Sequence, residues 1–213
     1  MTLEKTKRKF LLEVLKELPF SEWGVPLFHK AEINAGMSKN QHVLLYPAGV
    51  TDVVKSYEEY ADELMLQKLA KVKDFQKAKI RDKIKYAVKF RLDNSLKNSK
   101  LIIAKTKDYY KARINNYPEV LQSSWYTVDK MWQFAGDTST DYNYYTKRSL
   151  LFGVYNSTIL YYLQDESKDH AATWDFLDSR INDVLKIGSF KKHLNISSIC
   201  DNLPFVRQFK YYQ

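Results

Sequence analysis

Apolar residues recur at intervals of three and four positions along most of this 213-residue chain, which is the period of an amphipathic α-helix. The first such stretch runs from about Leu3 to Leu18 and is ended by Pro19. Further helices are expected at about 51–71, 74–96, 100–114, 118–136, 142–163 and 169–187, the last one ended by Gly188. The pattern predicts an all-α fold in which these helices form a bundle.

Two shorter helices are predicted near the N-terminus. Residues 26–35 have a proline near the start and Gly36 just past the end, as helices often do. Ser38 and Gln41 form an S-x-x-Q pattern, so Ser38 is expected to cap a second short helix that ends by Pro47. Together with the longer helix that follows, these two have the outline of a helix–turn–helix.

The chain is long enough for one well-filled core, and its scarce glycine (6) and proline (5) favour helices over strands joined by tight turns. We expect three segments along it. Residues 1–50 form a degenerate helix–turn–helix, residues 51–188 form the bundle, and residues 189–213 form a C-terminal amphipathic segment. The single cysteine, Cys200, excludes an intrachain disulfide and suits a reducing compartment.

Net charge is +9, and it is concentrated in one region. Residues 68–113 contain 16 Lys or Arg against four Asp. Such a basic region could face nucleic acid, an anionic membrane or water. No secretory signal is visible in the first nine residues, and the most apolar run, 150–163, is shorter than the roughly 20 residues that a membrane-spanning helix needs.

Chemical motifs are scarce. The four histidines, His29, His42, His170 and His193, lie on separate segments, and none follows a glutamate by three positions, as a helical di-iron site requires. His29 and Glu32 form a pair that we interpret as isolated, so no metal is predicted. The glycines are scattered singly, which excludes the usual phosphate-binding loops and the G-x-S-x-G elbow.

Two acidic pairs could in principle act as acid and base, namely Asp137 with Asp141 and Asp165 with Glu166. Helix capping and solvation explain them more simply. The sequence therefore favours a protein that is not an enzyme and that needs no cofactor.

Two stretches resemble known families. Residues 35–38 (AGMS), followed by Tyr46 and Pro47, resemble the N-terminal module of tetracycline-repressor-like regulators. Residues 135–148 (AGDTSTDYNYYTKR) resemble the longer signature A-G-D-x-S-T-D-x-N-W-Y-T-[KR]-R of the coenzyme Q biosynthesis protein nine family. Similarity to that second family continues through residues 154–155, 165–167, 173–177 and 180–184.

Membership of this family would imply a repressor-like helical fold, usually dimeric, with a lipid in its cavity. It would also imply a non-catalytic role in ubiquinone biosynthesis, in which the protein presents an isoprenoid quinone intermediate to the demethoxyubiquinone hydroxylase. The expected partners are therefore an isoprenoid lipid, that hydroxylase, a peripheral membrane surface and a second copy of the chain, without nucleic acid. The expected location is the cytoplasmic side of the inner membrane in a bacterium, or the matrix side in a mitochondrion.

The resemblance also places a hydroxylase-docking patch at the end of one helix and the start of the next. Matched by motif, the patch consists of Asp129, Met131, Asp141, Tyr144, Tyr145 and Arg148. Tyr144 stands where the family commonly has tryptophan, and Lys130 takes a place often held by an apolar residue. The alternative interpretation is that Asp141 only caps the helix and Tyr145 packs inward.

Candidate residues for the lipid cavity are apolar or aromatic side chains on the bundle helices. They are Tyr57, Leu64, Met65, Tyr86, Phe90, Trp125, Leu151, Val154, Tyr155 and Thr158. Residues of this kind are more often plain core than the lining of a cavity. Burial of a prenyl tail would contribute roughly 2.5 kcal/mol per 100 Å², before the costs of binding.

The C-terminal segment alternates aromatic and cationic residues, which suits a lipid interface or a fold-back onto the bundle. The candidate membrane-interacting residues are Phe205, Arg207, Phe209, Lys210 and Tyr212. Two other functions remain open. One is a tetracycline-repressor-type DNA-binding regulator with a hydrophobic ligand, in which residues 38–42 would face the major groove. The other is a membrane adaptor with a filled core.

Overall fold

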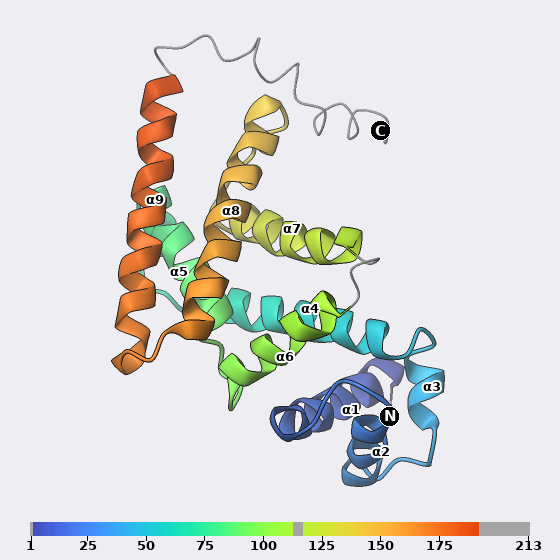
Figure 1. The fold of residues 1–213 in the computed structure, drawn as a ribbon. Coiled ribbons are helices and arrows are strands. Elements are labelled where there is room, and N and C mark those ends of the chain that lie inside the picture. Colours follow the sequence, from blue (N-terminus) through green and yellow to red (C-terminus); the bar gives the residue numbers. More distant parts are fainter. Residues whose placement is uncertain (1, 113–116, 192–213) are drawn as a thin grey trace.

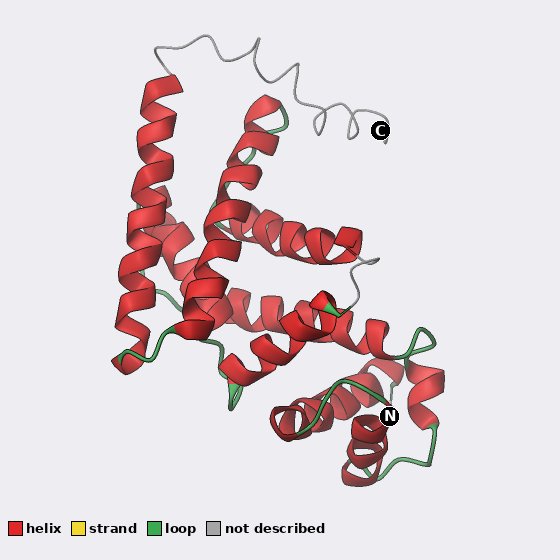
Figure 2. Cartoon of the chain, in the orientation of Figure 1, coloured by secondary structure: helices red, strands yellow, loops and turns green. Residues whose placement is uncertain are grey.

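The computed structural model describes residues 2–112 and 117–191, and every regular element in these two ranges is helical (Figures 1 and 2). The predicted all-α class is confirmed. None of the helices described is both long and apolar enough to cross a membrane.

The N-terminal part contains three helices and a short 3₁₀ turn. Helix α1 (Leu3–Glu17) is followed directly by the turn at Leu18–Phe20. Helix α2 (Val25–Asn34) packs against α1. The interface is filled by fully buried side chains, which include Phe10, Val14, Leu27 and Phe28. Phe10 and Val14 are among the apolar positions that the helical period predicts for α1.

Glycine ends α2 as predicted. Gly36 has a φ of +63°, its N–H bonds to the carbonyl of Ile33, and the N–H of Met37 bonds to the carbonyl of Glu32. This pair of bonds is the Schellman motif, which needs a left-handed residue that glycine adopts without strain.

The start of α3 (Gln41–Leu45) differs from the prediction. Asn40, with a φ of +64°, occupies the cap position instead of Ser38. Half of the expected capping box is present, because the Gln41 side chain accepts a hydrogen bond from the Ser38 N–H at 3.0 Å. The prediction of Ser38 as the cap is therefore wrong, and α3 is only five residues long.

Six longer helices form the rest of the fold: α4 (Val50–Leu69), α5 (Ile80–Leu92), α6 (Ser99–Lys111), α7 (Tyr117–Phe134), α8 (Tyr142–Gln164) and α9 (Ala171–Lys191). Helices α8 and α9 lie side by side, and α7 packs against α8 (Figure 1). Helix α4 links the two parts of the molecule. Val53 and Tyr57 belong to the N-terminal core, whereas Met65 and Leu69 belong to the core of the bundle.

The predicted boundaries of two helices are wrong. The helix expected from residue 74 begins only at Ile80, because Asp74 is left-handed (φ +55°) and Phe75 lies in a 3₁₀ turn, with its ring 5.4 Å from that of Phe134. Helix α9 continues past Gly188 to Lys191. A glycine inside a helix costs only about 1 kcal/mol, and on its own it does not end the helix.

A buried ion-pair network joins α4, α5 and α7. Arg91, 2% exposed, donates through Nε to Asp62 at 2.8 Å and also pairs with Glu58. Asp62 accepts two further bonds, from Thr127 Oγ1 at 2.9 Å and from Lys130 Nζ at 2.9 Å. Burial of these charges is tolerated because each has a close partner of opposite sign.

Removal of the Asp62 carboxylate should destabilise the fold strongly. Asp62→Ala leaves Arg91 buried with less compensation, which typically costs about 3 kcal/mol or more. The neighbouring Glu63 pairs with Arg8 at the surface, where both side chains are more than a third exposed, so Glu63→Ala should cost less than about 1 kcal/mol. Urea unfolding of both variants measures the difference, and equal losses would contradict a structural role for the buried network.

Candidate functional site

The turn between α7 and α8 is fixed by a helix end and a helix start only a few residues apart. Gly136, with a φ of +92°, ends α7 with the same Schellman bonds as Gly36. Its N–H bonds to the carbonyl of Gln133, and the N–H of Asp137 bonds to the carbonyl of Trp132. Asp141 begins α8, where its side chain accepts a hydrogen bond from the Asn143 N–H at 2.9 Å.

Arg148 lies at the centre of this turn and is 2% exposed. Its Nε donates to Asp129 on α7 at 2.5 Å, and its Nη1 donates to Asp137 in the turn at 3.0 Å. The guanidinium carbon lies 3.5 Å from the centre of the Tyr144 ring. One cation therefore fixes both carboxylates and one aromatic side chain.

Further hydrogen bonds complete this α7–α8 network, which we define as Asp129, Asp137, Tyr144, Lys147 and Arg148. The Tyr144 hydroxyl donates to Asp129 at 3.2 Å. Lys147 Nζ donates to Asp137 at 2.6 Å, and the Trp132 indole N–H donates to the Lys147 carbonyl at 3.1 Å.

The network shifts the titration of its members. Burial alone would raise the pKa of Asp137, but hydrogen bonds from Lys147, Ser139 and Arg148 outweigh it and hold that pKa below its ordinary value. Burial raises the pKa of the Tyr144 hydroxyl, and the nearby charge of Asp129 raises it further. Asp137 is therefore a carboxylate, and Tyr144 a neutral phenol, at neutral pH.

Aromatic side chains lie on the solvent side of the network. Tyr145 is 39% exposed, and its ring meets that of Tyr144 edge-on at 5.1 Å. Tyr142 is exposed as well. Aromatic side chains with a polar tip, fixed by the groups beneath them, are typical anchors of protein interfaces.

The predicted docking residues therefore occupy two layers. Asp141, Tyr144 and Tyr145 reach the surface, and Asp141 is also a helix cap, as the alternative interpretation holds. Arg148 lies beneath them, held by Asp129. Met131 is fully buried in the bundle core and offers no surface to a partner.

The predicted lipid-binding residues lie at different depths in the bundle. Only Tyr57 and Tyr155 line the pocket found between α4, α5, α6 and α8. Met65, Leu151, Val154 and Thr158 are buried, Leu64, Phe90 and Trp125 are half-buried, and Tyr86 is exposed. The predicted membrane-interacting residues, Phe205, Arg207, Phe209, Lys210 and Tyr212, lie outside the described residues.

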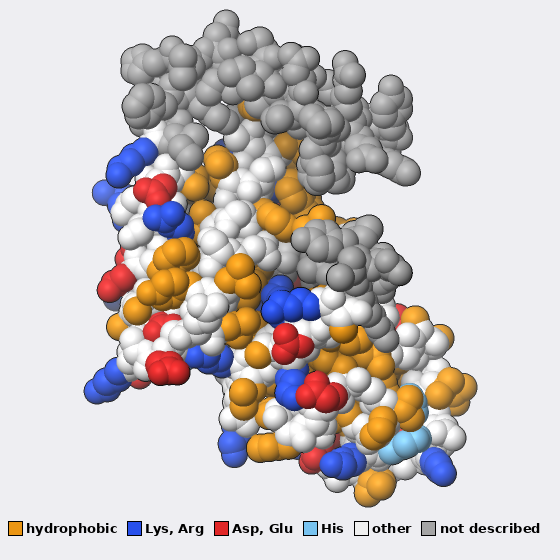
Figure 3. All heavy atoms as spheres, in the orientation of Figure 1, with side chains coloured by type: hydrophobic (Ala, Val, Ile, Leu, Met, Phe, Trp, Pro, Cys, Tyr) orange, Lys and Arg blue, Asp and Glu red, His pale blue; other side chains and the backbone are white. Residues whose placement is uncertain are grey.

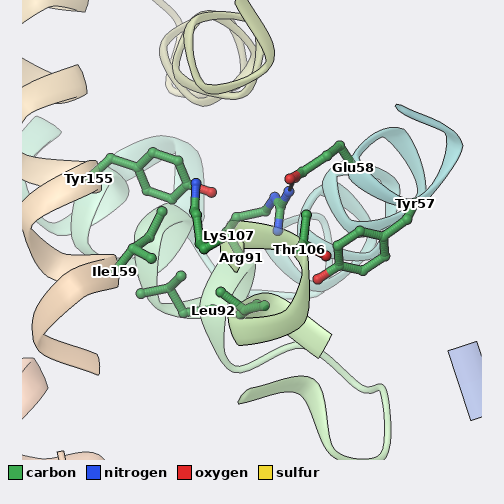
Figure 4. A pocket seen from close by; sticks show the side chains of 9 residues that line it. Tyr57, Glu58, Arg91, Leu92, Thr106, Lys107, Tyr155 and Ile159 are labelled. Atoms are coloured by element: carbon green, nitrogen blue, oxygen red, sulfur yellow. Dashed lines mark hydrogen bonds and ion pairs between the residues drawn. The ribbon is translucent and has the colours of Figure 1, made fainter. Parts of the chain in front are cut away.

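That pocket is small and lined by charged as well as apolar groups. Figure 4 shows Arg91 and Lys107 between Tyr57 on one side and Tyr155 on the other. Burial lowers the pKa of the Lys107 ammonium, and the Tyr57 hydroxyl is buried without a hydrogen-bond partner. The free volume is about 10 Å³, which is room for about one water molecule.

A third cluster corrects the interpretation of His29 and Glu32 as an isolated pair. Helix α3 folds back on α2 and brings His42 to the same carboxylate, so that one donor atom from each of the three residues lies within 4.8 Å of the others. Sequence spacing gives no hint of this contact, because the turn of the helix–turn–helix alone sets the distance between His42 and Glu32.

Neutralisation of Asp137 should remove stability in a pH-dependent way. Because the pKa of Asp137 is lowered in the folded state, its contribution is complete above the unfolded value of about 4 and is lost as pH falls through the folded value. Asp137→Asn should therefore destabilise the protein by about 2 kcal/mol at pH 7, and this gap should shrink below pH 4.

The measurement is urea unfolding of the wild type and the variant at pH 7 and pH 3. Asp108→Asn is the control, because Asp108 forms only an exposed pair with Lys111, at 3.8 Å. This control should lose less than about 1 kcal/mol at either pH. A gap for Asp137→Asn that stays constant with pH would show that the carboxylate charge does not stabilise the turn.

Comparison with known proteins finds a family match in the C-terminal part of the chain. Residues 117–188 match the model of the COQ9 family. The mitochondrial ubiquinone biosynthesis protein COQ9 of Rattus norvegicus is 48% identical over 79 residues, 37% of this chain and 25% of that protein. A probable mitochondrial coq9 protein of Dictyostelium discoideum is 33% identical over 120 residues, 54% of this chain and 36% of that protein.

The match therefore spans about a quarter of the rat protein's length. A TetR transcriptional regulator from Nitrosomonas europaea has a similar fold, with a TM-score of 0.63 over 83% of this chain and 95% of that one, at 17% sequence identity. This likeness concerns the fold alone. Residues 117–188 of the chain therefore match the COQ9 family, and they are part of a TetR-like helical fold.

Proposed function

We propose that this protein is a non-catalytic accessory protein of ubiquinone biosynthesis that acts through the α7–α8 turn. In this proposal the exposed rings above the α7–α8 network dock the demethoxyubiquinone hydroxylase, and the protein presents an isoprenoid quinone intermediate to it. The relatives named above are ubiquinone biosynthesis proteins, and their similarity supports the pathway.

One observation supports the docking proposal above all others. The family match includes the α7–α8 turn, and there a buried cation fixes two carboxylates and a tyrosine directly beneath exposed aromatic rings. A surface held in place before binding loses little side-chain entropy when a partner docks. The rings themselves bring apolar area together with hydroxyl groups.

Capture of the purified hydroxylase by the immobilised full chain tests the docking surface. Tyr145→Ser removes an exposed ring that does not hold the network, so capture should fall at least about tenfold while helicity stays unchanged. The matched control is Tyr86→Ser on α5, because Tyr86 is also 39% exposed and also contacts one ring, that of Phe90. Equal capture by the two variants would remove Tyr145 from the docking surface.

A dimer is part of the proposal. Helices α8 and α9 lie side by side and expose Leu160, Tyr161 and Leu185. Pairing of these helices with those of a second copy would cover the three side chains. Exposed apolar side chains that a second copy covers favour such an association.

Lipid binding requires the bundle to open. The pocket between α4, α5, α6 and α8 has room for about one water molecule, so a prenyl chain enters only if these helices move apart. Apolar burial would offset that cost by roughly 2.5 kcal/mol per 100 Å². The hydroxyls of Tyr57 and Tyr155 and the ammonium of Lys107 could then receive the oxygens of a quinone ring.

Mass spectrometry of lipids extracted from gently purified protein tests this part separately. An isoprenoid lipid should accompany the wild type, and Ile159→Phe, which fills the pocket, should reduce its amount several-fold. Conversely, a wild type without any isoprenoid lipid would refute the carrier function. The docking proposal would stand, because its test needs no lipid.

DNA binding is not favoured by the geometry of α3. The ring of His42, one of the residues expected to face the major groove, is 5% exposed and paired with Glu32. The exposed positions that follow are Val43 and Leu44, which offer no hydrogen bonds to base edges.

A further inference from the structure

We propose that His29, Glu32 and His42 form a binding site for a divalent transition-metal ion of the zinc class. The site joins α2 to the start of α3 in the N-terminal part of the molecule, where histidine atoms reach the surface (Figure 3). It is separate from the α7–α8 turn, so it does not depend on the proposed docking function.

Both imidazoles point at one carboxylate. His29 Nδ1 lies 3.0 Å from Glu32 Oε2, and His42 Nδ1 lies 2.7 Å from Glu32 Oε1. Ligand atoms around a tetrahedral zinc ion lie about 2.0–2.2 Å from the metal, and therefore roughly 3.3 Å from one another. Small side-chain rotations would thus bring the three donor atoms onto one ion.

The type of ligand also fits. Two imidazole nitrogens and one glutamate oxygen make up the set that some zinc enzymes use, and such a set leaves a fourth position for water. A neutral imidazole can present a lone pair at Nδ1 when its proton is on Nε2, so binding requires only this tautomer of each histidine.

The surroundings hold the carboxylate in place. The backbone N–H groups of Asn40 and His42 donate to the two oxygens of Glu32 at 3.1 and 2.9 Å. Burial opposes ionisation of Glu32, but these bonds and those to the two histidines outweigh it and lower its pKa to about 2. Groups of this kind around a metal site orient its ligands.

Aromatic packing holds the ring of His42 in place. The His42 ring is stacked on Phe10, with 6.2 Å between the ring centres and 12° between the planes, and it also contacts Phe28 at 5.3 Å. His29, in contrast, has a side chain that is 35% exposed, so an ion can reach the cluster from solvent on that side. Glu32 and His42 are therefore held in place before an ion binds, and His29 leaves the site open to solvent.

Titration of the full, tag-free chain after chelator treatment tests the site. Isothermal calorimetry with Zn²⁺ should give one bound ion per chain, and Co²⁺ should give the intense visible absorption bands of a four-coordinate ion. His29→Gln should weaken both at least about tenfold. Because His29 is partly exposed, circular dichroism of this variant should match that of the wild type.

His170→Gln is the matched control. His170 lies outside the cluster, against the ring of Tyr162 at 4.5 Å, and its loss should leave the affinity for Zn²⁺ unchanged. His42→Gln, which removes a second ligand, should abolish the Co²⁺ bands. Absence of saturable Zn²⁺ binding by the wild type, or affinity that His29→Gln does not lower, would overturn the site.

Discussion

Buried charge compensated by close partners is the interaction on which this fold depends. Arg91 and Arg148 are both 2% exposed, in places where a lone cation would cost several kcal/mol. Each guanidinium pairs with two carboxylates of another element: Arg91 on α5 with two carboxylates of α4, and Arg148 on α8 with one of α7 and one of the turn that follows it. The charges therefore select one arrangement of α4, α5, α7 and α8 among the many that apolar packing alone would allow.

The two buried arginine networks lie at different depths in the molecule. Around Arg148 the network stops just below the surface, beneath the rings of Tyr144 and Tyr145. Around Arg91 it lies in the interior and leaves a space no larger than a water molecule. The proposed docking function therefore has a fixed surface to act through, whereas the proposed lipid binding requires the interior to open.

The sequence predicted what depends on local geometry. The ends of α2 and α7 follow from Gly36 and Gly136, because a left-handed residue at a helix end is a local requirement. The sequence could not show that Phe75 turns back onto Phe134, which shortens α5, nor that His42 meets Glu32. These contacts join residues whose separation is set by the fold, and no period or motif encodes it.

For the candidate site, the sequence predicted its location along the chain but not how deeply each of its residues is buried. The family signature pointed to the α7–α8 turn, where Tyr144 is half-buried and Tyr145 is exposed, and their role in docking stays a prediction. The depth of each residue was not predictable, because an arginine in a polar motif would ordinarily be assigned to the surface. Met131 lies in the core because α7 packs against α4, α5 and α8, and Met131 is on a buried face of that helix.

Helix α4 has a mechanical consequence for the whole chain. Its 20 residues form a rod of about 30 Å that is embedded in one hydrophobic core at the first end and in the other at the second. Neither core can melt without exposing apolar residues on this shared rod. The N-terminal helices and the bundle are therefore expected to unfold in a single cooperative transition. A movement of the N-terminal helices is expected to be transmitted to the bundle through α4, because a helix is stiff.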